Sequence, residues 1–131
     1  MKTAYLDFLG ERYEIALKVS AYMHGDNLYI GMQCKDGGNW EPFGDLTVNL
    51  PQYRVDPDEA FISGDSSREK LEFIEENNLG EILPGEAKSG FGRYKCVAFD
   101  LQKLAEFDPK GVANYCALHG ISLEKDGGLN E

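Results

Sequence analysis

The chain contains few of the residues that usually mark a functional site. Two histidines and three cysteines (Cys34, Cys96 and Cys116) occur among its 131 residues. The odd cysteine count and the lack of a C-x-x-C pair argue against a disulfide framework and favour buried thiols in a reducing compartment. The sequence also lacks a P-loop, a dinucleotide fingerprint and a nucleophile elbow. These absences favour a protein that is not an enzyme and that uses no cofactor.

Long apolar segments are absent as well. No run approaches the roughly 18 apolar residues of a membrane span. The stretch from Met1 to Tyr5 leads straight into an alternating pattern and lacks the apolar centre of a signal peptide. We therefore expect a cytoplasmic protein that does not contact membranes.

Basic residues are scarce relative to acidic ones. The chain has 13 Lys and Arg against 23 Asp and Glu, which gives a formal net charge of −10. A field of this sign repels nucleic acid and anionic membranes, and it favours a basic partner such as a basic host protein. The same acidity also keeps an ordinary cytosolic protein soluble, so a purely solvated acidic surface is the open alternative.

The length and the 42% hydrophobic content suit one domain with its own core. We place this single α+β domain at residues 1–120. Residues 121–131 contain Gly127-Gly128 and little apolar content, so we expect a loose C-terminal tail there.

The first half of the chain shows the period-two alternation of strands with one buried face. Apolar residues alternate over the segments 4–8, 13–19, 28–34 and 46–50. The turn at Gly10-Glu11 and the turn-rich segments 24–27 and 36–39 separate them. Short links between consecutive strands predict an antiparallel meander. A surface loop over 51–65 follows, with a short edge strand at 60–62.

The clearest helix of the chain follows this loop. Ser66 and Glu69 have the spacing of a capping box, in which each residue bonds the backbone N–H of the other. Leu71 and Ile74 lie three residues apart on one face, and Gly80 is placed to end the helix.

The last third of the domain reads as a loop, a strand and two short helices. Residues 81–92 are rich in glycine and proline, and residues 94–99 predict a fifth strand. Asp100 and Asp108 are placed to start the two helices, and Gly120 is placed to end the second. The expected fold class is α+β: an antiparallel meander sheet of four to six strands packed against one main helix, with short C-terminal helices.

Candidate metal ligands are sparse. Cys116 and His119 share a helical face, but no second pair with zinc-ligand spacing occurs. The segment from Asp56 to Glu59 resembles the start of a calcium loop only loosely, because it lacks the glycine and the closing glutamate of an EF-hand. We predict no metal site.

The acidic residues of the second half suggest a surface for a partner. Rows of carboxylates can imitate the phosphates of a duplex and occupy the basic groove of a nucleic-acid enzyme. The candidate row contains the acidic residues Asp56, Asp58, Glu59, Glu69, Glu72, Glu76 and Glu86.

Aromatic residues are the candidate apolar anchors of such a surface. Phe91 lies in the glycine-rich turn 89–92, which we expect to expose it. Phe61 belongs to the short edge strand, and Trp40 and Phe43 are further candidates. The predicted partner-binding set therefore joins Phe61 and Phe91 to the acidic row.

A small-ligand-binding domain is the alternative function. It would have a pocket between the sheet and the helix, lined by aromatic residues from both halves of the chain. The candidates are Tyr13, Tyr29, Tyr94 and Phe99. Such residues belong to the core more often than to a pocket.

Several segments together resemble a known family. They are Asp45–Pro51, Glu59–Ile62, Leu71–Gly80, Ser89–Tyr94 and Phe99-Asp100. Over about residues 5–105 the chain resembles small proteins of unknown function encoded by gut Gram-positive bacteria, often on plasmids and conjugative elements. The resemblance implies an accessory bacterial protein without a known activity, cofactor or site residue. Because small acidic proteins of mobile elements include inhibitors of restriction and CRISPR enzymes, this context suggests an inhibitor of a nucleic-acid-handling host protein.

Overall fold

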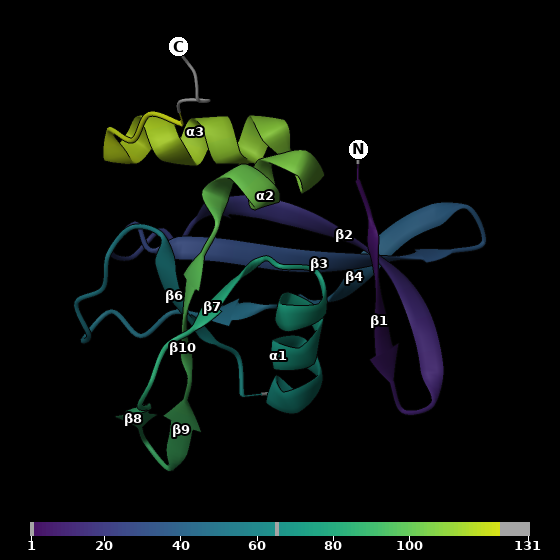
Figure 1. The fold of residues 1–131 in the computed structure, drawn as a ribbon, viewed down its shortest axis with the longest axis horizontal. Helices are drawn as coiled ribbons and strands as arrows, with labels where there is room; N and C mark the ends of the chain where they lie inside the picture. The colour runs from purple at the N-terminus through teal and green to yellow at the C-terminus, as the bar shows by residue number, and fades with distance from the viewer. Residues whose placement is uncertain (1, 65, 124–131) are drawn as a thin grey trace.

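The computed structural model describes residues 2–64 and 66–123, which form a mixed α+β fold of antiparallel sheets and three helices. The first four strands form an antiparallel meander in the order β1-β2-β3-β4, and the first three of these strands lie where the sequence predicts them (Figure 1). Their bounds are Ala4–Phe8 for β1, Glu11–Ala21 for β2, Leu28–Asp36 for β3 and Asn39–Asp45 for β4.

The alternation in β2 and β3 creates one buried face of the meander. Leu17 pairs with Met32 and Val19 pairs with Ile30, and these four side chains are at most 5% exposed. The turn between β1 and β2 lies at Leu9-Gly10, one residue earlier than predicted, and both residues have positive φ, which suits a tight hairpin.

Strand β4 is a feature that the sequence pattern did not predict. Pro42 and Gly44 lie within it, and both residues are depleted in strands. Pro42 pairs with Gln33 and Gly44 pairs with Met32, so Phe43 is the extra residue of a β-bulge. The fourth strand predicted over 46–50 is wrong, because only Thr47–Val48 forms a strand there (β5) and this strand joins another sheet.

The second sheet has the order β5-β6-β10-β7 and is formed by residues far apart in the sequence. The bounds of its further strands are Glu59–Ile62 for β6, Gly80–Ile82 for β7 and Cys96–Phe99 for β10. The expectation of an edge strand at 60–62 is wrong, because β6 pairs with β5 on one side and with β10 on the other. The predicted loop 81–92 contains the end of β7, all of β8 (Ala87–Ser89) and the first residue of β9 (Gly92–Tyr94), and β8 and β9 pair as a hairpin.

The three helices are α1 (Ser67–Glu76), α2 (Leu101–Phe107) and α3 (Pro109–His119). The predicted starts of α2 and α3 are confirmed: Asp100 accepts from the backbone N–H of Gln102, and Asp108 accepts from that of Gly111. Gly120 ends α3 with a φ of 68°.

Helix α1 follows Ser66 as predicted, but its capping box and its predicted end are wrong. Ser66 has a left-handed backbone, with φ at 55°, and its side chain makes no capping hydrogen bond, so no capping box forms. At the other end Asn78 takes the left-handed conformation and Gly80 already belongs to β7.

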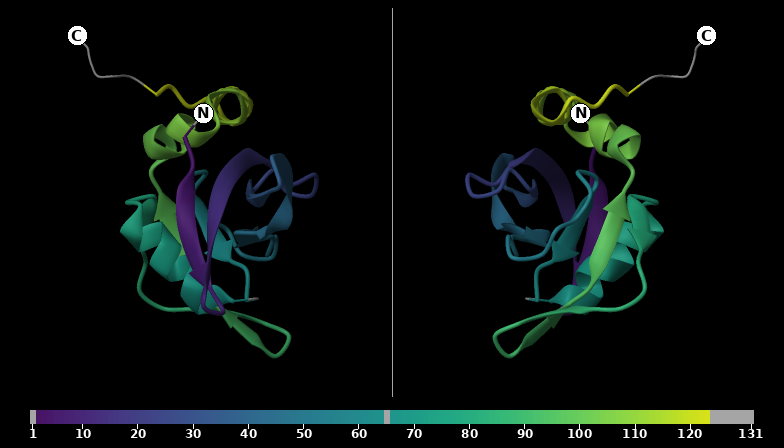
Figure 2. Two further views of the ribbon diagram at one scale, coloured as in Figure 1. Left: turned by 90° about the vertical axis from the view of Figure 1, so that its right-hand side faces the viewer. Right: turned by 90° about the vertical axis from the view of Figure 1, so that its left-hand side faces the viewer.

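The elements enclose one main core and one small satellite core. In the side views of Figure 2 the meander lies on one side, α1 and the second sheet lie on the other, and α2 and α3 cover one end. The main core joins Leu17 and Ile30 of the meander to Ile62, Phe73 and Leu104. The satellite core is centred on Leu50, Phe61 and Ala87, and the β8–β9 hairpin contributes Ala87 and Tyr94 to it.

Packing continues a little beyond residue 120. Ile121 and Leu123 contact the main core. The rest of the predicted tail, residues 124–131, lies outside the described residues. Of the helices that the structure describes, none has the length and apolar character needed to cross a lipid bilayer.

Candidate functional site

Helix α1 brings three of the predicted acidic residues together with a fourth from β1. Asp7, Glu69, Glu72 and Glu76 surround a small hollow beside Leu6 and Phe73. Helical spacing places positions 69, 72 and 76 along one side of α1, and β1 packs next to that side. We call these four carboxylates the acidic face of α1. No local sequence pattern marks Asp7 as a member, because β1 and α1 are about sixty residues apart in the chain.

Two arginines border the acidic face without neutralising it. Arg12 Nε lies 2.9 Å from Asp7 Oδ1, and its hydrogen bond lowers the pKa of this exposed carboxyl. Arg68 Nε lies 3.6 Å from Glu72 Oε2. Among the described residues, Glu69 and Glu76 have no ion-pair partner within 4.0 Å. The face therefore keeps a net negative charge that can attract a cationic surface.

The other predicted acidic residues divide into two places. Carboxylate oxygens of Asp56, Asp58 and Glu59 lie within 4.8 Å of one another. Glu59 Oε1 accepts from the backbone N–H of Asp56, so one role of this carboxylate is to hold a turn. Glu86 lies apart from them on the β8 side, 3.9 Å from Arg93.

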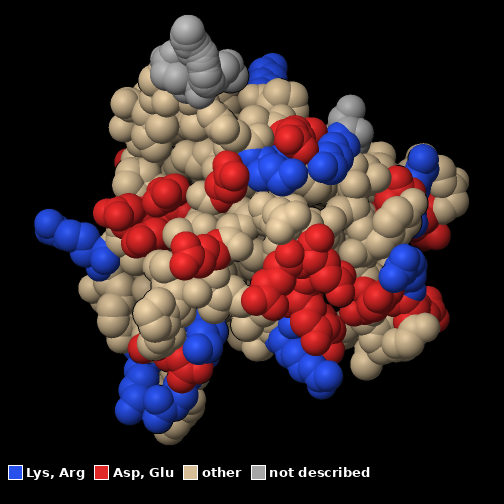
Figure 3. Space-filling model, viewed as in Figure 1, with Lys and Arg blue, Asp and Glu red and all other residues tan. Residues whose placement is uncertain are grey.

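A hydrogen bond from α3 holds the 56–59 turn in place. The hydroxyl of Tyr115 donates to the backbone carbonyl of Pro57 over 2.6 Å, and burial raises the pKa of Tyr115. Figure 3 shows carboxylates gathered over α1 and a second acidic group below α3, both on the face that is seen in Figure 1. Acidic groups far apart in the sequence are therefore displayed on one side of the molecule.

The predicted aromatic anchors do not lie with the carboxylates. Phe91 is fully exposed at the tip of the β8–β9 hairpin, as expected, but its near neighbours in that hairpin are Lys88 and Arg93. Phe61 is 7% exposed and packs against Tyr53 in the satellite core, so it is not a surface anchor. The exposed aromatic next to the acidic face is instead Tyr5, which shares its side of β1 with Asp7.

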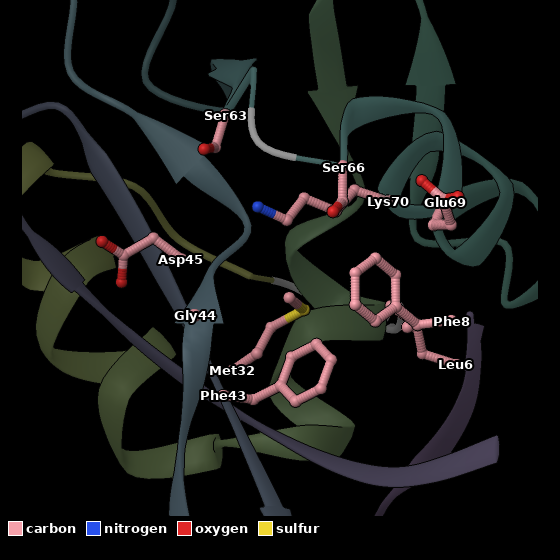
Figure 4. A pocket seen from close by; sticks show the side chains of 10 residues that line it. All are labelled: Leu6, Phe8, Met32, Phe43, Gly44, Asp45, Ser63, Ser66, Glu69 and Lys70. Atoms are coloured by element: carbon pink, nitrogen blue, oxygen red, sulfur yellow. The ribbon is translucent and has the colours of Figure 1, made fainter. Parts of the chain in front are cut away.

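A pocket of about 520 Å³ lies between the meander and α1, where the alternative function placed one (Figure 4). We call it the meander–helix pocket. None of the four predicted aromatics lines it. Tyr13 packs on Phe43 with ring centres 5.0 Å apart, and Tyr29 donates a 2.8 Å hydrogen bond to Asp45. Tyr94 and Phe99 belong to the two cores.

Cys96 on β10 and two residues of α3, Cys116 and His119, have the surroundings of structural rather than catalytic side chains. His119 packs against Tyr115 with the two rings tilted by 44°, and its Nε2 donates to the carbonyl oxygen of Asp26 over 2.8 Å. Burial raises the pKa of Cys116, and burial together with nearby acidic groups raises that of Cys96 to about 11. Thiols of this kind are poor nucleophiles at neutral pH.

These features define a mixed α+β domain with an acidic face and a meander–helix pocket. Residues 16–119 match the model of a family described as a domain of unknown function, DUF4313. Because the match covers more than half of the chain, the protein belongs to this family. Comparisons with the curated proteins and with the solved structures found no match. The bacterial origin and the mobile elements that the sequence resemblance implied stay predictions.

Proposed function

We propose that this protein binds a basic macromolecule through the acidic face of α1, and that its partner is a host protein that handles nucleic acid. The observation that carries the proposal is the convergence of Asp7, Glu69, Glu72 and Glu76 around one small hollow, with a second acidic group on the same face of the molecule (Figure 3). The protein would act by binding and not by catalysis.

The charge arrangement suits fast and selective association. A net charge of −10 steers cationic partners toward the molecule over about a Debye length. The helix backbone holds these glutamates at a fixed spacing, so a partner with lysine and arginine side chains at a matching spacing can contact several of them at once. Tyr5, 53% exposed beside Asp7, supplies an aromatic surface at the edge of the contact.

Inhibition follows from the same chemistry. A groove that binds phosphates presents lysine and arginine side chains, and carboxylates can pair with these side chains in place of phosphates. A protein bound there would exclude nucleic acid by occupying the groove.

Capture from a host-cell lysate across a salt series tests the proposal. A triple variant, Glu72→Gln with Glu75→Gln and Glu76→Gln, removes three exposed charges from α1 and leaves the pocket lining intact. We expect the wild type to capture a basic protein whose binding weakens as salt rises and is competed by duplex DNA. The triple variant should lose most of this binding.

A control variant carries the same change of net charge elsewhere. Glu11→Gln with Asp36→Asn and Glu41→Gln removes three exposed charges from the meander. It should capture the partner nearly as well as the wild type. Equal loss in both variants would show that only net charge matters, and salt-insensitive capture would contradict the proposal outright.

A further inference from the structure

We propose that the meander–helix pocket is a binding site for a small zwitterion with an apolar side group, the chemistry of a free apolar α-amino acid. This inference does not rest on the proposed function. The pocket shares only Glu69 with the acidic face of α1.

One half of the pocket is apolar. Met32 and Leu6 form its floor and are each 2% exposed, while the rings of Phe8 and Phe43 stand at its side. The two rings meet edge to face at 6.3 Å. Phe43 is the bulge residue of β4, and bulges recur where a strand must aim a side chain into a site. This half suits an aliphatic or aromatic side group.

The other half of the pocket is polar and contains a buried ammonium. Lys70 is 6% exposed, and in Figure 4 its side chain crosses the pocket and ends between Ser63 and Ser66. An ammonium has three N–H donors, so Lys70 can hold a carboxylate and still keep contacts within the protein. A charge-assisted bond of this kind is stronger in a site shielded from water.

Ser66 and the start of α1 favour an anion at the same place. The Ser66 side chain does not cap the helix, and Ser66 lines the pocket instead. The first N–H groups of a helix carry partial positive charge and readily donate hydrogen bonds to a carboxylate. The absence of the predicted capping bond thus leaves the Ser66 hydroxyl in the polar half of the pocket, where it can donate to a carboxylate.

The remaining charges call for a cation on the ligand. Asp45 and Glu69 lie on either side of Lys70, the first on β4 and the second on α1. A plain carboxylate would be repelled by these two groups, whereas the ammonium of an amino acid is attracted to them. The volume of about 520 Å³ falls in the range of small-molecule sites and holds an amino acid with an apolar side chain.

Amide NMR on the ¹⁵N-labelled full chain tests the proposal, with L-phenylalanine and L-leucine as probes. We expect saturable shifts at the amides of Gly44, Ser63 and Ser66. Two analogues test the two charged groups separately: 3-phenylpropionate lacks the ammonium and 2-phenylethylamine lacks the carboxylate. Each should bind at least about tenfold more weakly than L-phenylalanine, because each loses a charge-assisted bond.

Three variants locate the site. Lys70→Met should weaken L-phenylalanine binding by at least about tenfold. Phe43→Ala, on the edge strand, should also weaken it and does not depend on the folding of the Lys70 variant. Glu41→Gln lies on the same strand as Phe43, outside both the pocket and the acidic face of α1, and should leave binding unchanged.

The titrations and variants test the site, the class of its ligand and its location separately. Saturable shifts confined to the pocket, with the expected order of analogues, support the site and its ligand class. No shift with either amino acid up to its solubility limit overturns the site. Equal binding of 3-phenylpropionate and L-phenylalanine overturns the zwitterion, and unchanged binding by both Lys70→Met and Phe43→Ala overturns the location.

Discussion

Helix α1 presents carboxylates on its exposed side, whereas its other side is buried in the protein. Glu72, Glu75 and Glu76 are exposed, while Phe73 and Ile74 are at most 1% exposed. The difference shows how one short helix can carry two roles. The buried side holds the fold and the pocket wall in place, so the exposed side can vary in chemistry at little cost to stability.

The largest expected effect comes from the buried side. Phe73→Ala removes a ring that is 1% exposed in the main core, and we expect a loss of about 3–5 kcal/mol in the free energy of unfolding. Denaturant titration measures it, with Glu72→Ala as the matched variant from the exposed side. A similar cost for both substitutions would remove the distinction between the two sides.

A second effect compares the start of α1 with that of α3. Asp108 accepts from the backbone N–H of Gly111 at 3.1 Å and from that of Val19 at 2.9 Å, so it joins α3 to the meander. We expect Asp108→Ala to cost about 2–3 kcal/mol, from a lost cap and an unpaired N–H. Ser66→Ala should cost far less, because Ser66 makes no capping bond. Thermal or chemical unfolding measures both variants. An equal loss of stability in Asp108→Ala and Ser66→Ala would contradict the difference between the two helix starts.

A third effect concerns the hydrogen bond between Tyr29 and Asp45 at high pH. Burial and the hydrogen bond to Asp45 raise the pKa of Tyr29 to about 12. Between the ordinary tyrosine pKa of about 10 and this value, the folded protein keeps a proton that the unfolded chain has lost, so this group's contribution to stability falls as pH rises.

Tyr29→Phe removes this contribution. The variant should show a less steep fall in the free energy of unfolding between about pH 10 and 12, by up to about one proton. Denaturant titrations at several pH values measure the slope. Identical slopes for wild type and variant would mean that Tyr29 titrates normally.

The smallest effect on stability belongs to the exposed side of α1. Glu72→Gln, Glu75→Gln and Glu76→Gln should each change the free energy of unfolding by no more than about 0.5 kcal/mol. Unfolding curves of the single and triple variants measure this directly. A large loss would indicate that these carboxylates support the fold, which would leave their role in partner binding without its physical basis.

Much of the local structure could be predicted from the sequence. Alternation identified β1 to β3, and Asp100, Asp108 and Gly120 correctly marked helix ends, because these signals depend on neighbouring residues only. Strand β4 was missed because Pro42 and Gly44 hide it, and β7 to β9 are three residues each, too short to show a period.

The site depended on contacts that local patterns do not contain. Asp7 joins the acidic face through the packing of β1 on α1, and Phe43 enters the pocket through a bulge that only strand pairing reveals. Phe61 did have a signal: Ala60, Phe61 and Ile62 are consecutive apolar residues, and such a run is typical of a strand covered on both faces.

One amide NMR experiment on a single labelled sample tests the central claim, that the two sides of α1 serve different ligands. An oligolysine peptide and L-phenylalanine are titrated separately. We expect the peptide to shift the amides of Glu72, Glu75 and Glu76, and L-phenylalanine to shift those of Gly44 and Ser63, with the two sets distinct. Shifts of the same amides by both probes, or no shift on α1 with the cationic peptide, would contradict the claim.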